Sequence, residues 1–128
     1  MASLISDSDM FIDTLRRREP ARTRIGALIR SGDLATTSMS VYELYVGART
    51  DEEAVRIARL LEDVEVFELD APAARRAAEV YRFLQSAGLR IEQPDCLIAG
   101  IALVRNLPLL TRNARDFERV PGLRVITL

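Results

Sequence analysis

Short apolar segments alternate with amphipathic helical segments along the whole chain, and this alternation restricts the fold more than any other feature. Joining strands through helices favours parallel pairing with right-handed crossovers, and the apolar runs suit strands buried on both faces. The pattern therefore predicts an α/β sandwich around a mainly parallel sheet. The predicted strands are 4–7, 34–38, 64–69, 107–111 and 123–127. The predicted helices are 9–18, 20–31, 40–47, 51–62, 71–87 and 94–105, with one further helical turn after Asn113.

Polar residues and glycines mark the expected ends of several helices. Ser40, Asp51 and Asp70 are predicted N-caps, because their side chains can accept hydrogen bonds from the free N–H groups of a first turn. Gly32 is predicted to end the helix that Pro20 opens. These boundaries leave short connections throughout.

The 128 residues contain no linker, internal repeat or low-complexity run, so we expect a single domain spanning 1–128. No segment approaches the roughly 20 apolar residues that cross a bilayer. Three arginines at 16–18 follow the first apolar stretch, whereas a secretory signal carries its positive charge in front. We expect a cytoplasmic protein that does not associate with a membrane.

The basic and sulfur-containing residues exclude several kinds of chemistry. The chain has no histidine and no lysine, so all 18 basic residues are arginines. A Ser-His-Asp triad, a histidine-ligated metal and a P-loop lysine are therefore absent. Cys96 is the single cysteine, which excludes an internal disulfide. Carboxylates, hydroxyls, arginines and a recruited metal remain for catalysis. The net charge of −1 argues against a protein that simply coats nucleic acid.

Four acidic residues fall at predicted strand ends or at the starts of the following helices. They are Asp7, Glu43, Asp95 and Asp116. Ligands of open parallel sheets bind beyond the carboxyl ends of the strands, so this topology gathers the four acids at one edge. Each acid also has a purely structural interpretation, as a helix cap or as a charge that favours a helix N-terminus.

The combination of four acids at one edge favours a metal site. Carboxylates crowded into one cleft repel each other, which raises their pKa values and destabilises the fold unless a cation lies between them. Hard oxygen ligands suit Mg²⁺ or Mn²⁺. Such ions can activate water for the hydrolysis of a phosphodiester without any histidine.

Three stretches give the chain a family resemblance. They are DSDMFID at 7–13, SVYELYVGA at 40–48 and QPDCLIAGIALVRNLPLLTRNARDFERVPGL at 93–123. With this order and spacing the sequence resembles PIN-domain proteins, most closely the VapC-type toxins of prokaryotic toxin–antitoxin pairs. The resemblance implies a three-layer α/β/α sandwich with about five strands. It also implies an endoribonuclease dependent on Mg²⁺ or Mn²⁺.

The resemblance assigns roles to individual residues. Asp7, Glu43, Asp95 and Asp116 match the acidic, metal-holding quartet of the family, which is also its catalytic set. Supporting roles fall to three neighbours, Ser8, Thr111 and Asn113. We interpret Asp9 as a helix cap, with metal ligation as the alternative. Arg112 is the nearest candidate for contact with an RNA phosphate.

The implied partners are an RNA substrate, a cognate antitoxin held by the helices at about 40–62, and a second copy of the chain in a homodimer. The arginines at 16–18, 22 and 24 form either an RNA-contacting surface or a solvated helix face. Two other classes of function stay open. One is a haloacid dehalogenase-like phosphatase with Asp7 as nucleophile and Asp9 as general acid, although that family normally needs a lysine. The other is a non-catalytic binding module in which the acids are caps.

Overall fold

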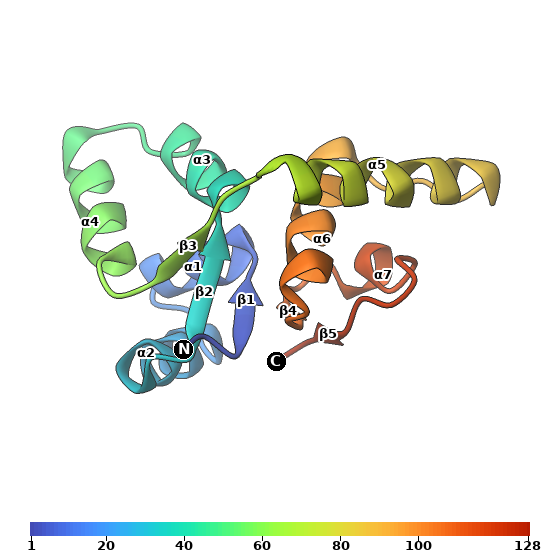
Figure 1. Cartoon of the computed structure of the whole chain (residues 1–128). Helices are drawn as coiled ribbons and strands as arrows, with labels where there is room; N and C mark the ends of the chain where they lie inside the picture. Colours follow the sequence, from blue (N-terminus) through green and yellow to red (C-terminus); the bar gives the residue numbers. More distant parts are fainter.

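The computed structural model describes residues 1–128 and contains one five-stranded sheet in which every pair of neighbours is parallel. The strand order is β3-β2-β1-β4-β5 (Figure 1). The strands are β1 (Leu4–Ser6), β2 (Leu34–Thr37), β3 (Glu65–Phe67), β4 (Leu109–Leu110) and β5 (Val125–Ile126). All five predicted strands exist, each shorter than predicted. The α/β prediction is confirmed.

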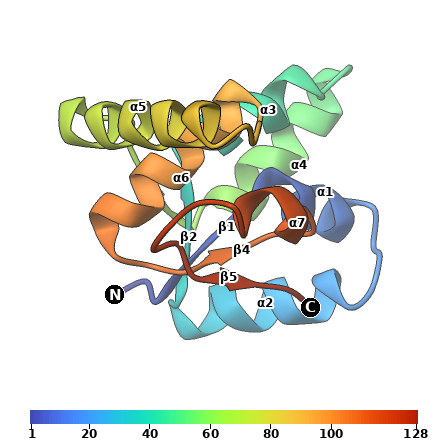
Figure 2. The same ribbon diagram turned by 90° about the vertical axis from the view of Figure 1, so that its right-hand side faces the viewer.

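Helices cover both faces of this sheet (Figures 1 and 2). They are α1 (Ser8–Leu15), α2 (Ala21–Ser31), α3 (Ser38–Val46), α4 (Asp51–Leu61), α5 (Ala71–Ser86), α6 (Gln93–Arg105) and α7 (Ala114–Phe117). None of them is long and apolar enough to cross a membrane.

The side-chain alternation of the strands divides the interior into two cores. Ile5 of β1 and Leu109 of β4 pack with α5, α6 and Phe117 of α7 on one face of the sheet. Leu110, the next residue of β4, and Leu34 of β2 point to the other face, where they pack with α1, α2 and α4. Because successive strand residues point to opposite faces, an apolar run without alternation supplies both cores. The three-layer arrangement follows directly.

Two of the three predicted N-caps are wrong by one to three residues. Thr37, not Ser40, caps α3, and its side chain accepts a hydrogen bond from the Ser40 backbone N–H. Thr50, not Asp51, caps α4. In both places the capping residue has extended backbone and the helix begins at once after it. Asp70 caps α5 as predicted, accepting from the backbone N–H of Ala73.

A close crossing of α5 and α6 fixes where α6 begins. Gly100 lies at this crossing, and a Cβ added there would sit 2.6 Å from the carbonyl oxygen of Ala73 and 2.7 Å from the Cβ of Ala77. Only glycine allows the two helices to approach this closely. The crossing therefore helps to hold the first turn of α6, which carries Asp95, at the edge where the strands end.

Candidate active site

The adjacency of β1 and β4 places Asp7 beside Thr111. Ser6 pairs with Leu110 in the sheet, so the next residue of each strand lies at the same edge. The Thr111 hydroxyl donates to Asp7 Oδ2 at 3.0 Å, and the Ser8 backbone N–H donates to Asp7 Oδ1 at 2.8 Å. Asp7 is only 7% exposed and is the N-cap of α1. Its carboxylate is therefore fixed through both oxygens.

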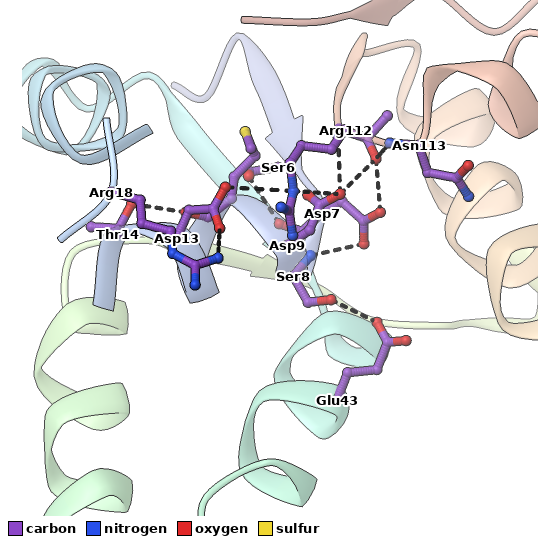
Figure 3. A network of polar contacts seen from close by, with 12 residues as sticks. Ser6, Asp7, Ser8, Asp9, Asp13, Thr14, Arg18, Glu43, Arg112 and Asn113 are labelled. Carbon is purple, nitrogen blue, oxygen red and sulfur yellow. Dashed lines mark hydrogen bonds and ion pairs between the residues drawn. The ribbon is translucent and has the colours of Figure 1, made fainter. Parts of the chain in front are cut away.

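Asp9 is not the helix cap that the sequence suggested, because Asp7 occupies that position. Asp9 lies in the first turn of α1 and turns its carboxylate toward β4 (Figure 3). Asp9 Oδ2 accepts from the Arg112 backbone N–H at 2.9 Å and from the Thr111 hydroxyl at 3.3 Å. Asp9 Oδ1 is buried without a hydrogen-bond partner. Because a hydroxyl has one proton, Thr111 divides it between two carboxylates.

Glu43 reaches the same edge from α3, which begins where β2 ends. The Ser8 hydroxyl donates to Glu43 Oε1 at 3.2 Å (Figure 3). Ser8 thus links the start of α1 to α3 across 35 residues of sequence. Glu43 lies on the second turn of α3, half-buried.

Asp95 and Asp116 approach the same edge of the sheet from α6 and α7. The Asn113 side-chain amide donates to Asp95 Oδ2 at 3.3 Å, while its backbone N–H donates to the Thr111 hydroxyl at 3.0 Å. Asn113 makes no side-chain cap for α7. Asp116, on α7, forms an ion pair of 3.7 Å with Arg119. The Thr111–Asn113 segment therefore connects Asp7 to Asp95.

The carboxylates at this edge influence one another's ionisation. Burial, and then the charge of Asp9, raise the pKa of Asp7 to about 7, and Asp95 adds to this effect. Burial, and then the charges of Glu43 and Asp116, raise the pKa of Asp95 to about 6. Burial also raises the pKa of Asp9. All four acids of the predicted quartet thus belong to one electrostatic cluster.

Arg112, the residue after Thr111, is held by two acids outside the quartet. Arg112 Nε lies 3.4 Å from Asp13 Oδ2 and 3.9 Å from Asp9 Oδ2 (Figure 3). Asp13 is 7% exposed and also lies 3.8 Å from Arg18. Asp13 was not among the predicted site residues, although its spacing of four residues from Asp9 places the two on one face of α1. Neither Asp7 nor Asp95 forms an ion pair.

The donor set fits a hard divalent cation. Carboxylate oxygens and the Thr111 hydroxyl are suitable ligands, and a cation would offset the repulsion that raises the pKa values of Asp7 and Asp95. No three acidic side chains lie close enough together to hold an ion by themselves. Mg²⁺ typically binds through one or two carboxylates and keeps several waters, so such a closed group is not required.

A sheet of this order with acids from separate segments gathered at its carboxyl edge defines the PIN domain class. The family model of the PIN domain matches residues 4–123, and the chain belongs to this family. It is 30% identical to the tRNA(fMet)-specific endonuclease VapC of Shigella flexneri, over 97% of this chain and 96% of that protein. It is 35% identical to ribonuclease VapC5 of Mycobacterium tuberculosis, over 94% of this chain and 90% of that protein.

Solved structures agree with this placement. The DNA-bound VapBC of Salmonella typhimurium superposes with a TM-score of 0.82 and 26% identity, covering 99% of this chain and 98% of that chain. These similarities favour the nuclease alternative over the phosphatase and the binding module.

Proposed function

We propose that this protein is an endoribonuclease that acts as the toxin of a toxin–antitoxin pair and requires Mg²⁺ or Mn²⁺. The observation that carries the proposal is the cluster of Asp7, Glu43, Asp95 and Asp116, in which Asp7 and Asp95 are destabilised as anions and have no arginine partner. Its ribonuclease relatives in the PIN family support the RNA substrate.

The roles of the residues follow from their contacts. Asp7 and Asp95 would hold the cation, with Glu43 and Asp116 binding it directly or through water. When bound, the cation supplies Lewis-acid stabilisation of the phosphate and a water of lowered pKa. Thr111 keeps the Asp7 carboxylate in one orientation through its 3.0 Å hydrogen bond. Ser8 and Asn113 do the same for Glu43 and Asp95.

RNA cleavage by the purified protein tests the activity. We expect cleavage with Mn²⁺ or Mg²⁺ and none with EDTA. Asp95→Asn should abolish cleavage, whereas Asp63→Asn, which removes an exposed carboxylate distant in sequence from the cluster, should leave it intact. Equal cleavage by Asp95→Asn and the parent would reject the site assignment. Because the Shigella flexneri relative is a tRNA(fMet)-specific endonuclease, tRNA(fMet) is the first substrate to test.

A groove beside Glu43 supports an antitoxin partner. It has a volume of about 560 Å³ and lies between the end of α1, α3 and α4, with Glu43 and Val46 among its lining residues. Val46 is 65% exposed, as is Tyr42 on the same helix. Exposed apolar side chains beside a groove are typical of a protein-binding site. A segment lying in this groove would reach the acidic cluster and block it.

Complex formation with the product of the neighbouring gene tests the partner. Val46→Asp should weaken the complex and leave RNA cleavage unchanged, while Val104→Asp, which changes an exposed valine on α6, should affect neither. Failure of the parent protein to form any complex would contradict the antitoxin proposal. The proposed homodimer is tested by sedimentation of the purified chain.

A further inference from the structure

A hollow lined by arginines lies at the opposite end of α1 from the acidic cluster. Its volume is about 400 Å³, and Arg17, Arg22, Arg56 and Arg59 line it together with residues of α1 and α4. The four arginines come from the α1–α2 connection, α2 and α4, and all are exposed. No acidic residue lines the hollow.

These four guanidinium groups lack carboxylate partners. None of the ion pairs in the protein involves any of them. Arg56 donates to the Leu15 carbonyl at the C-terminus of α1, which holds its side chain at the hollow. The Glu19 carboxylate accepts hydrogen bonds from the backbone N–H and the hydroxyl of Thr23. These bonds lower the pKa of Glu19, and the charge of Arg22 contributes to the same effect without forming an ion pair. Four positive charges that form no ion pair therefore surround one depression in a chain of net charge −1.

A line of charged side chains runs along α1 from Asp9, beside the acidic cluster, toward the end of the helix that bears the hollow. Arg112 and Arg18 both contact Asp13, so the pairs run along α1 from Asp9 toward its C-terminal end (Figure 3). The eight residues of α1 span about 12 Å at ~1.5 Å per residue. An extended polyanion with one phosphate at the acidic cluster can therefore place a later phosphate at the hollow.

We propose that the arginine hollow binds the sugar–phosphate backbone of the RNA substrate, away from the bond that is cut. The inference rests on the proposed function. Without its cation the acidic cluster repels RNA, and a single bound cation would contact only the phosphate at the cut bond. Affinity for the rest of the backbone therefore requires positive side chains elsewhere on the surface. The planar guanidinium group binds phosphate oxygens through two parallel hydrogen bonds. Such contacts position a strand and carry no sequence information.

The salt dependence of RNA binding tests this site. The probe is a fluorescein-labelled single-stranded RNA of about 16 nucleotides, a length within the usual range for single-strand grooves. Binding is measured with EDTA in an Asp95→Asn background, so that the RNA stays intact. The test variant combines Arg22→Gln and Arg59→Gln. The matched control combines Arg75→Gln and Arg82→Gln, two exposed arginines on α5 without ion pairs.

The logarithm of the RNA-binding constant falls linearly with the logarithm of the salt concentration. Each lost phosphate contact should make this slope less steep by about 0.7. We therefore expect the slope of the test variant to be less steep than that of the parent by about 1.4, and its RNA binding at low salt to be weaker. The control variant should keep the parent slope. Melting temperatures equal to that of the parent confirm that the variants fold. An unchanged slope in the test variant overturns the inference. If the slope is unchanged and the test variant also binds the antitoxin more weakly, the hollow belongs to the protein partner instead.

Cleavage assays separate this inference from the proposed function. If the parent cleaves RNA with Mn²⁺ and the test variant keeps the parent slope, the hollow is wrongly assigned and the nuclease stands. If the slope depends on the arginines and the parent never cleaves RNA, the hollow stands and the nuclease is wrong. A parent protein that binds no RNA overturns both.

Discussion

Replacing Asp7 with asparagine should make the metal-free protein more stable at alkaline pH. Burial and the charge of Asp9 raise the pKa of Asp7 from 3.8 to about 7, so its ionised form is disfavoured in the folded state. At ~1.36 kcal/mol per pKa unit, this shift corresponds to about 4 kcal/mol of destabilisation once the group is ionised in both states. Asparagine removes the charge and retains an oxygen that can cap α1.

The sign of the pH dependence follows from the raised pKa. Below about pH 4 the carboxyl is protonated in both states and contributes no penalty. As the pH rises from about 4 to about 7, the unfolded state ionises first and the parent loses stability relative to Asp7→Asn. Above about pH 7 the difference reaches its full value, an upper estimate of about 4 kcal/mol.

Urea unfolding in EDTA, at about pH 8 and about pH 4, measures this difference. With a slope near ~2 kcal/mol per molar, we expect the urea midpoint of Asp7→Asn to exceed that of the parent by up to about 2 M at the higher pH. At the lower pH the two midpoints should converge. Asp63→Asn, on an exposed turn, should match the parent at both. A midpoint for Asp7→Asn at or below that of the parent at the higher pH would refute the reasoning.

Four further changes should give distinct results. Gly100→Ala should lower the free energy of unfolding by about 1–3 kcal/mol in urea, because the added methyl group meets the backbone of α5. Gly26→Ala should instead stabilise α2 by about 0.5–1 kcal/mol, since its new methyl group meets only the mobile end of an arginine side chain; a loss of stability would contradict this. Thr111→Val removes the hydroxyl that orients Asp7, so the rise in melting temperature on adding Mn²⁺ should shrink, and Thr111→Ser should restore it. Asp13→Asn removes the ion pair that holds Arg112, so it should reduce RNA cleavage while the rise in melting temperature with Mn²⁺ changes little. Unchanged cleavage would show that cleavage does not depend on this ion pair.

The sequence was sufficient to predict the layers and the gathering of Asp7, Glu43, Asp95 and Asp116 at one edge of the sheet, while their role as metal ligands stays a prediction. Strand and helix patterns have local periods, so alternation along the chain identifies each element before any contact is known. Parallel pairing then directs the ends of β1 and β4 to the same edge, which brings Asp7 and Thr111 together. The predicted N-cap Ser40 was wrong, because several neighbouring hydroxyl groups can cap a helix. The residue that does so is Thr37, since β2 ends there and the helix follows at once.

The roles of Asp9, Asp13 and Arg112 were decided by the tertiary structure alone. Arg112 lies 103 residues from Asp9 in sequence, and their contact depends on the register between β1 and β4 and on the rotation of α1 about its axis. The arginine hollow likewise requires α4 to pack beside the end of α1. Local patterns determine which element a residue joins, whereas the partners of a charged side chain depend on how distant elements pack.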